Sequence, residues 1–431
     1  MKIWDKGFSV NEKIEKFTVG KDRVLDVYIA KYDAIASKAQ ANMLAKVGII
    51  TDEDNAKLQP ALDEIIKRCD AGEFIIDDEY EDVHSKIEAE LIGKTGDAGK
   101  MIHTARSRND QVLVAIQLFL KDYLTDTREK VLNLIDILVD KADEHKDNLM
   151  PGYTHFQAAM PSSFGMWFSA YAENLLSDLY FLDAAYKVAD QNPLGSGAGF
   201  GTSFKIDRKE TTKEMGFSEM AVSSVGAQML RGKTEKSTAV AIAMLSATLS
   251  KMSYDLVMYN SQDLGFVKLP KEMTTGSSIM PHKKNPDVFE LTRAHCNRLQ
   301  ALPNDITMTI SNLPSGYHRD FQILKEFLFE PMFQFNDILD ILIFAIPQLE
   351  IKDDFMNQGK YDGIYTVENI NHLLQTGTSF RDAYRIVGIS VDEGTYVPHR
   401  EFKTSHLGSI HNLGLDEIRS KISRYKSSIP S

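Results

Sequence analysis

The run of residues 234–263 constrains the fold of this chain most, because it contains neither proline nor glycine. A helix through the whole run would be about 45 Å long at 1.5 Å per residue. Its middle part, Ala239 to Leu249, is apolar nearly all round and rich in alanine. A helix without a polar face is normally buried on every side, within a large bundle or between subunits. The run therefore predicts an all-α core of long helices, most simply in an oligomer.

Apolar residues recur at helical spacing through most of the remaining chain. We expect long helices over 21–47, 51–69, 112–123, 125–145, 162–189, 287–313 and 326–349, and shorter ones over 366–376, 379–387 and 415–422. A polar break is expected over 93–99, and no regular alternating pattern indicates a β-sheet. We predict an all-α fold with an N-terminal helical domain (1–106), a central long-helix bundle (107–350) and a small C-terminal helical domain (351–431).

Composition excludes several classes of function. The 431 residues carry a net charge of −12, which argues against a general nucleic-acid role. Two cysteines without paired spacing exclude a disulfide framework and a cysteine zinc site, and they fit a reducing compartment. The start of the chain lacks the apolar segment of a signal peptide, and no uninterrupted apolar run reaches membrane-spanning length. We expect a soluble cytoplasmic protein that binds neither nucleic acid nor membranes.

The stretch Gly276–Pro286 contains several hydroxyl, ammonium and amide side chains, and its composition argues against a helix or a strand. Its prolines, glycine, serines and asparagine predict a loop. Ser277, Lys283 and Asn285 could supply a proton-transfer group and donors for an anionic substrate. A polar surface loop with solvated lysines explains the same composition.

Two further segments combine helix starts or turns with reactive side chains. His103–Gln111 places two arginines beside a serine and an asparagine at the entry to a helix, which favours a carboxylate site. Helix capping with surface ion pairs is the alternative. Pro151–Gln157 places His155 in a Pro-Gly turn expected just before a helix, and histidine exchanges protons readily near neutrality. A purely structural histidine remains the alternative there.

A glycine-rich segment and a second polar helix start complete the candidates. Gly195–Ser203 lacks the spacing of dinucleotide and phosphate loops, so we expect close backbone approach to a ligand or to another subunit. Tyr317–Gln322, followed by Lys325 and Glu326, would suit a polar amino-acid substrate. An ordinary helix start with solvated charges fits as well.

Five of these segments together resemble a known family. Gly276–Asn285 fits the G-S-S-x-M-P-x-K-x-N signature of the fumarase/aspartase superfamily at every specified position. His103–Gln111 resembles H-T-G-R-S-R-N-D-Q of argininosuccinate lyases, with Ala105 in place of the glycine. The segments Pro151–Gln157, Leu194–Thr202 and Tyr317–Gln322 are similar to P-G-Y-T-H-x-Q, L-G-S-G-A-x-x-G-T and Y-N-[KR]-D-x-Q of the same family. Their order and spacing agree over nearly the whole chain.

The resemblance implies an elimination that releases fumarate from argininosuccinate and leaves arginine. A Cβ proton is removed through an aci-carboxylate intermediate, and neither a metal nor an organic cofactor is needed. Ser277 corresponds to the loop serine that takes the proton, and His155 to the histidine assigned to proton transfer. Lys283 and Asn285 correspond to the groups that hold the carboxylate whose negative charge grows.

The resemblance also implies substrate-binding residues and an assembly. Positions that bind the succinyl part correspond to Ser107, Arg108, Asn109 and Thr154, and those that hold the arginine part correspond to Tyr317, Gln322 and Lys325. Members of this family form homotetramers whose active sites are assembled from three subunits. This agrees with the all-round apolar helix expected over 234–263.

Several positions depart from the family pattern and bear on substrate recognition. The W-G-G-R-F start appears only as Trp4–Phe8, and a substrate-contacting serine aligns with Gly20. The S-D-R-D-F segment is replaced by Val225–Lys233, where Arg231 is the candidate for its arginine. His282 in the signature is more usual in adenylosuccinate lyases.

Two alternatives follow. Another fumarate-releasing lyase such as adenylosuccinate lyase is disfavoured by the segments His103–Gln111 and Tyr317–Lys325, which are those of the argininosuccinate branch. A catalytically silent, crystallin-like relative would not need the four reactive positions of the signature loop and of Pro151–Gln157 together.

Overall fold

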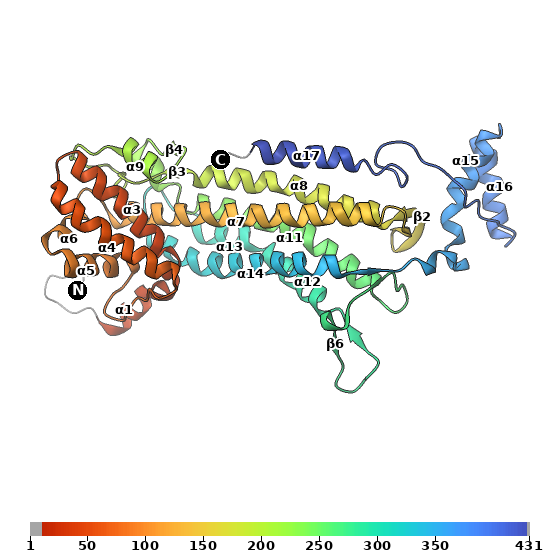
Figure 1. Cartoon of the computed structure of the whole chain (residues 1–431), viewed down its shortest axis with the longest axis horizontal. Coiled ribbons are helices and arrows are strands. Elements are labelled where there is room, and N and C mark those ends of the chain that lie inside the picture. The colour runs from red at the N-terminus through yellow and green to blue at the C-terminus, as the bar shows by residue number, and fades with distance from the viewer. Residues whose placement is uncertain (1–10, 429–431) are drawn as a thin grey trace. The chain divides into compact units, whose positions relative to one another are not determined.

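The computed structural model describes residues 11–428 and is built almost entirely of helices (Figure 1), so the predicted all-α fold is confirmed. The chain forms two compact units. Unit 1 comprises Met1–Arg128, Tyr180–Met244 and Arg298–Phe335, and unit 2 comprises Glu129–Leu179, Leu245–Asn297 and Asn336–Ser431. The three-domain division into 1–106, 107–350 and 351–431 remains a prediction. The expected family-like start, Trp4–Phe8, lies outside the described residues.

Unit 1 begins with short and medium helices (Figure 1). They are α1 (Glu12–Val19), α2 (Asp22–Leu25), α3 (Val27–Lys46), α4 (Asp52–Asp70), α5 (Val83–Thr95) and α6 (Asp97–Met101). α3 packs against α4 and α5. The helix expected over 21–47 is interrupted at Asp26, and the expected break over 93–99 is reduced to Gly96, which has a φ of +63°.

Helix α4 starts where its sequence predicts. The Thr51 hydroxyl accepts a hydrogen bond from the Asp54 N–H at 3.0 Å, and the Asp54 carboxylate accepts one from the Thr51 N–H at 3.3 Å. This reciprocal capping box satisfies two backbone donors that have no partner within the helix. The helix expected over 51–69 therefore begins where predicted, with Thr51 as its N-cap.

The long helices are α7 (Arg108–Glu144), α8 (Phe164–Ala189), α11 (Lys233–Tyr259), α12 (Asp287–Leu299), α13 (Leu302–Ile310) and α14 (Leu324–Ala345). The separate helices expected over 112–123 and 125–145 are one helix, because residues 108–144 contain neither proline nor glycine. The single helix expected over 287–313 is instead α12 and α13, with a proline in the first turn of α13. Proline favours the first turn of a new helix.

Helix α11 is only partly covered within one chain. Leu245 and Leu249 are fully buried, whereas Met244 and Tyr254 are 36% and 43% exposed. By length and composition α11 could cross a membrane, but half of its most apolar window is buried in the protein, as in the core helix of a soluble protein. Burial on every side is therefore not achieved by one chain alone.

Four short strand pairs were not expected from the sequence. β1 (Leu149–Thr154) pairs with β2 (Gln157–Ser163), β3 (Gln191–Asn192) with β4 (Glu219–Met220), β5 (Val267–Lys268) with β8 (Glu350–Ile351), and β6 (Thr275–Gly276) with β7 (Lys284–Asn285). Only the β3–β4 pair is parallel. Two of the antiparallel pairs, β1–β2 and β6–β7, carry candidate site residues at their ends.

The remaining elements are shorter. They are α9 (Arg208–Glu214), α10 (Ser224–Gln228), α15 (Thr366–Gln375), α16 (Phe380–Asp392) and α17 (Leu415–Ser428), with the 3-10 helices η1 (Lys271–Met273), η2 (Arg319–Ile323), η3 (Ile346–Gln348), η4 (Asp354–Asn357) and η5 (Gly359–Tyr365). The three short helices predicted near the end of the chain are confirmed, and α16 and α17 extend beyond their expected ends.

Candidate active site

The predicted site residues are divided between the two units. Ser107, Arg108, Asn109, Tyr317, Gln322 and Lys325 lie in unit 1, and Thr154, His155, Ser277, Lys283 and Asn285 lie in unit 2. The residues expected to hold most of the substrate are thus in one unit, and those expected to move protons are in the other.

In unit 1 the chain brings predicted residues from distant segments to one cavity of about 260 Å³. Five of the six predicted residues of this unit line it: Arg108, Asn109, Tyr317, Gln322 and Lys325. The other lining residues are Asp22, Asp26, Glu81, Asp82, His84, Val112, Arg231 and Arg319. Most of the wall is charged or hydrogen-bonding, which suits a small polar ligand rather than an apolar one.

The entry to α7 is capped by its own sequence. The Ser107 N–H donates to Asp110 Oδ1 at 2.8 Å, and the Asn109 N–H donates to Ser107 Oγ at 3.3 Å. The positive end of the α7 dipole therefore lies at Arg108 and Asn109, where it favours an anion. This geometry agrees with the predicted carboxylate site.

The glycine-rich loop approaches this helix entry closely. The buried Asp110 carboxylate accepts hydrogen bonds from the backbone N–H groups of Gly195 at 3.0 Å and Gly197 at 2.8 Å. Burial raises the pKa of Asp110, although these backbone donors oppose the rise. Gln228 holds the other side of the loop, with its Nε2 2.9 Å from Ser196 Oγ. The loop thus approaches Asp110 and Gln228 of the same chain, and the predicted approach to a ligand or to another subunit remains a prediction.

Charged groups around the α7 entry are partly paired. Arg108 Nη1 donates to Gln111 Oε1 at 3.1 Å, and Arg108 Nη2 lies 3.4 Å from Glu88 Oε2. Burial, together with the nearby Arg106 and Arg108 guanidinium groups, lowers the pKa of His103 to about 4. The histidine that opens this segment is therefore neutral at physiological pH and adds no positive charge.

Lys325 is enclosed by two carboxylates. Its side chain is only 4% exposed, and its Nζ lies 2.7 Å from Asp22 Oδ1 and contacts Asp26 Oδ1. Burial raises the pKa of Asp22 to about 6, with Lys325 opposing the rise and Asp26 adding to it. The lysine charge is therefore already compensated inside the cavity wall.

Gly20 and Gln322 lie together. The Gln322 amide donates to the Thr18 carbonyl at 2.8 Å and to the Val19 carbonyl at 3.2 Å. A Cβ at Gly20 would lie about 4 Å from the Gln322 amide, but the φ of +56° at Gly20 would strain any side chain there. The serine that the family places at Gly20 would therefore face Gln322, whose amide here contacts backbone carbonyls of the same turn.

In unit 2 His155 lies at the tip of a hairpin. The prediction that His155 lies in a turn directly before a helix is wrong. β1 and β2 pair from Leu149 to Ser163, with Thr154 opposite Gln157. His155 and Phe156 adopt φ angles of +54° and +57°, which non-glycine residues rarely do. Thr154 and His155 are exposed, as a proton-transfer group in an open cleft would be.

The predicted signature loop is confirmed as a loop, closed at its base by β6 and β7 (Figure 1). Ser277 Oγ accepts hydrogen bonds from the backbone N–H groups of Ile279 at 3.4 Å and Met280 at 3.2 Å. These donors would stabilise a deprotonated serine oxygen. Lys283 is exposed on the same loop, and Asn285 Nδ2 lies 3.5 Å from Thr275 Oγ1 at its base.

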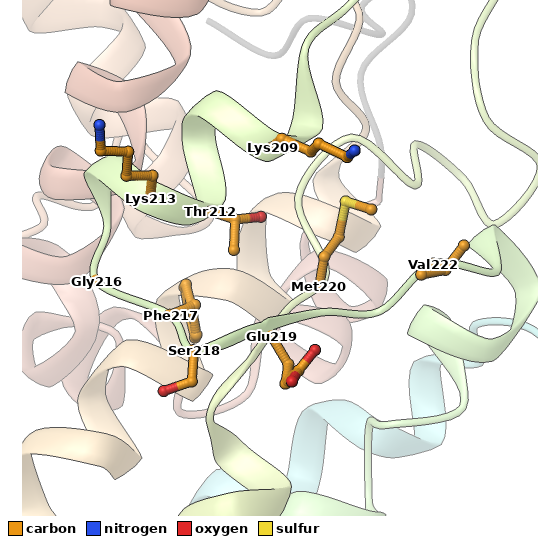
Figure 2. A pocket seen from close by; sticks show the side chains of 9 residues that line it. All are labelled: Lys209, Thr212, Lys213, Gly216, Phe217, Ser218, Glu219, Met220 and Val222. Atoms are coloured by element: carbon orange, nitrogen blue, oxygen red, sulfur yellow. The ribbon is translucent and has the colours of Figure 1, made fainter. Parts of the chain in front are cut away.

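A second hollow in unit 1, of about 590 Å³, lies between α9 and the β4 segment. Figure 2 shows Lys209 and Lys213 directed away from each other on α9, with Glu219 and Met220 on the facing segment. The lysine ammonium groups do not converge on a common point, so this hollow does not form a charged site like the first cavity.

Sequence reasoning missed the acidic wall of the first cavity. Asp22 and Asp26 are one helical turn apart, a spacing that also occurs on any solvated helix face. His84 lies at the start of α5 and shows no motif around it. Arg231, considered only as a replacement for a family arginine, is found in the cavity wall. Their chemistry becomes visible only where the fold brings them beside Lys325.

Comparison with known proteins identifies the family. A family model described as a lyase matches residues 10–301. A Phocaeicola vulgatus protein named argininosuccinate lyase is 48% identical over 419 residues, covering 97% of this chain and 94% of that protein. A Thermotoga neapolitana protein of the same name is 39% identical over 389 residues, covering 90% and 97%.

Solved structures show the same fold. A crystal structure of EDDS lyase in complex with formate has a TM-score of 0.76 at 20% identity, covering 98% of this chain and 90% of that one. The crystal structure of fumarate lyase:delta crystallin from Brucella melitensis bound to cobalt has a TM-score of 0.73 at 17% identity, covering 98% and 94%. At such identities the likeness concerns the fold alone.

Proposed function

Because this chain belongs to the argininosuccinate lyase family, we propose that it eliminates fumarate from argininosuccinate and releases arginine. One observation supports the substrate most directly. Arg108, Asn109, Tyr317, Gln322 and Lys325, taken from three distant segments, line one polar cavity of about 260 Å³. A cavity of this polarity fits a charged amino acid better than a nucleotide base.

The proposed reaction begins with removal of the Cβ proton by Ser277. A proton next to a carboxylate is a very weak acid, so the base and the developing negative charge must both be stabilised. The N–H groups of Ile279 and Met280 already point at Ser277 Oγ and would favour its anionic form. Closure of the exposed loop over the substrate would exclude water from this step.

Lys283 and Asn285 stabilise the negative charge that develops when the Cβ proton is removed. As the Cβ proton leaves, the adjacent carboxylate gains charge as an aci-carboxylate, which an ammonium and an amide donor stabilise. The C–N bond then breaks, the electrons that form the double bond of fumarate come from the carbanion, and the guanidino nitrogen departs. His155 moves a proton in this sequence from its exposed hairpin tip.

Substrate binding is assigned to both units. Ser107, Arg108, Asn109 and Thr154 hold the succinyl part, with the N-terminal end of α7 favouring its carboxylates. Tyr317, Gln322 and Lys325 hold the arginine part in the unit 1 cavity. Neither a metal nor an organic cofactor takes part in these steps.

We infer a cytoplasmic homotetramer in which active sites are shared between subunits. The half-exposed α11, with Met244 and Tyr254 uncovered, offers an apolar face for packing against another copy. Sharing would also let residues of unit 1 in one copy work with Ser277 and His155 of others. Size-exclusion chromatography with light scattering tests the tetramer, and a monomer would contradict it.

Substrate specificity is tested by fumarate release from purified protein. We expect release from argininosuccinate and none from adenylosuccinate. Release only from adenylosuccinate would keep the elimination chemistry and overturn the assignment of Tyr317, Gln322 and Lys325. Release from neither would favour a catalytically silent relative.

Site sharing is tested by mixing two inactive variants. Ser277→Ala removes the base in unit 2, and Arg108→Ala removes a binding group in unit 1. If subunits share sites, dissociation and reassociation of the mixture should restore part of the activity, because some sites then receive both intact residues. Activity that stays at the level of the separate variants would show that each site comes from a single chain.

A further inference from the structure

We propose that Tyr254 is a positioning residue that holds His155 in place for its proton transfer, acting through Phe156. This inference rests on the proposed function, in which His155 moves a proton. In this assignment Tyr254 contacts Phe156 and not the substrate. His155, Phe156 and Tyr254 all belong to unit 2, so the contact lies within one compact part of the chain.

The turn that carries His155 has a backbone conformation that its residues disfavour. Thr154 pairs with Gln157, so His155 and Phe156 are the central residues of a two-residue turn, with φ angles of +54° and +57°. Such turns favour asparagine and glycine, because a Cβ in the left-handed region lies too close to the following carbonyl oxygen. A histidine and a phenylalanine therefore stay in this conformation only where neighbouring groups hold them.

Phe156 contacts the ring of Tyr254 on helix α11. The ring centroids are 6.3 Å apart and the ring planes are inclined at 59°. An aromatic pair at this separation is favourable beyond the area that it buries. Phe156 remains 68% exposed and Tyr254 43% exposed, so the contact holds the tip of the hairpin without enclosing it. Because His155 directly precedes Phe156, a shift of the Phe156 ring would also move the imidazole.

Tyr254 is itself held by contacts with two other helices. The Arg293 guanidinium of α12 lies over the Tyr254 ring, 5.5 Å from its centroid, where cation–π attraction is favourable. The next residue, Asp255, accepts hydrogen bonds from Trp167 Nε1 at 2.9 Å and from the Tyr171 hydroxyl at 2.6 Å, which joins α11 to α8. Because α8 directly follows β2, this joint fixes the base of the same hairpin whose tip Tyr254 contacts.

The test measures kcat and KM for fumarate release from argininosuccinate by full-length variants. Tyr254→Ala should lower kcat about tenfold or more, since a displacement of about 1 Å can cost about a hundredfold, and should change KM by less than about twofold. Tyr254→Phe keeps the ring and should keep most of the activity. Phe156→Gly should also lower kcat about tenfold, although glycine relieves the strained turn. If Phe156 served only the turn conformation, this variant would lose no activity.

A double-mutant cycle shows whether the loss of activity passes through His155. In the His155→Ala background, Tyr254→Ala should lower the residual kcat by less than about twofold, because the group that it positions is absent. A further loss of about tenfold in that background would overturn the assignment, and so would a normal kcat for Tyr254→Ala. Phe156→Gly leaves α11 unchanged, so it tests the same contact if Tyr254→Ala does not fold.

Controls separate this role from a loss of structure or of assembly. Tyr384→Ala removes an exposed tyrosine of α16 whose ring lies 6.3 Å from that of Phe380, the same separation, and it should leave kcat unchanged. Rates are compared for fractions of equal mass by light scattering and equal helix content, so that dissociation or unfolding is not counted as a loss of kcat. If the unsubstituted protein releases no fumarate, the proposed function fails and the positioning role fails with it. A normal kcat for Tyr254→Ala beside an active unsubstituted protein overturns the positioning role alone.

Discussion

Replacing Lys325 by methionine should strongly destabilise the protein, because the buried Asp26 and the partly buried Asp22 would lose the one cation that pairs with both of them within residues 11–428. Methionine keeps most of the side-chain volume and removes the charge. Even with Lys325 present, the rise of the Asp22 pKa from 3.8 to about 6 corresponds to about 3 kcal/mol at neutral pH. Removing one partner from a buried ion pair typically costs about 3–5 kcal/mol. We expect a loss in that range near neutrality.

The size of this stability loss should depend on pH. A carboxyl group with a raised folded pKa binds its proton more tightly in the folded state than in the unfolded state. The contribution of Asp22 to the free energy of unfolding therefore falls as the pH rises from about 4 to 6, and it is regained on acidification. The variant lacks the ammonium group that opposes this rise, so its deficit should be large at about pH 8 and much smaller at about pH 5.

Urea unfolding, followed by the helical circular-dichroism signal, measures the deficit at both pH values. Lys100→Met is the matched control, because Lys100 pairs with Asp97 at 2.7 Å on the surface and should leave the midpoint unchanged. The triple replacement Asp22→Asn, Asp26→Asn and Lys325→Met removes all three charges and should recover most of the stability. A loss below about 1 kcal/mol for Lys325→Met, or one equal at both pH values, would refute this reasoning.

Four further substitutions test three separate features: the proposed base, two glycine positions and a helix cap. Ser277→Ala should lower kcat by at least about a thousandfold with unchanged helix content, measured as fumarate release; a near-normal rate would exclude this serine as the base. Gly195→Ala should destabilise the protein by about 1–3 kcal/mol, because φ is +87° and the added Cβ would lie 2.8 Å from Arg208 Cγ. Gly93→Ala, with open space in the last turn of α5, should instead stabilise by about 0.5–1 kcal/mol in the urea assay. A gain of stability for Gly195→Ala together with a loss for Gly93→Ala would contradict this reasoning. Thr51→Ala should cost about 1 kcal/mol by removing the α4 cap, and an unchanged unfolding midpoint would contradict it.

Local signals account for what could be predicted of the fold. Thr51 and Asp54 form their capping box within four residues, so the start of α4 could be predicted from neighbouring side chains alone. The hairpin around His155 could not. Pro151 and Gly152 are typical of turns, yet here they lie inside β1, and the reversal occurs at His155 and Phe156 instead. The pairing of β1 with β2 overrides the local preference.

The candidate site also has one part that could be predicted from the sequence and one part that could not. Ser277 and its loop could be predicted because the proline, glycine and serine content and the family signature occupy one continuous stretch. The acidic cluster could not, since Asp26 and Lys325 are 299 residues apart in sequence and meet only in the folded unit. Resemblance to a family located Lys325 but gave no sign that two carboxylates compensate its charge. That feature depends on the packing of α2 and α14.

The most direct test of the whole account is to incubate the purified protein with argininosuccinate and to measure fumarate and arginine together. We predict that both appear in equal amounts, and that Ser277→Ala abolishes both. Equal release that persists in Ser277→Ala would contradict the proposed mechanism. Absence of both products with the unsubstituted protein would contradict the proposed function itself.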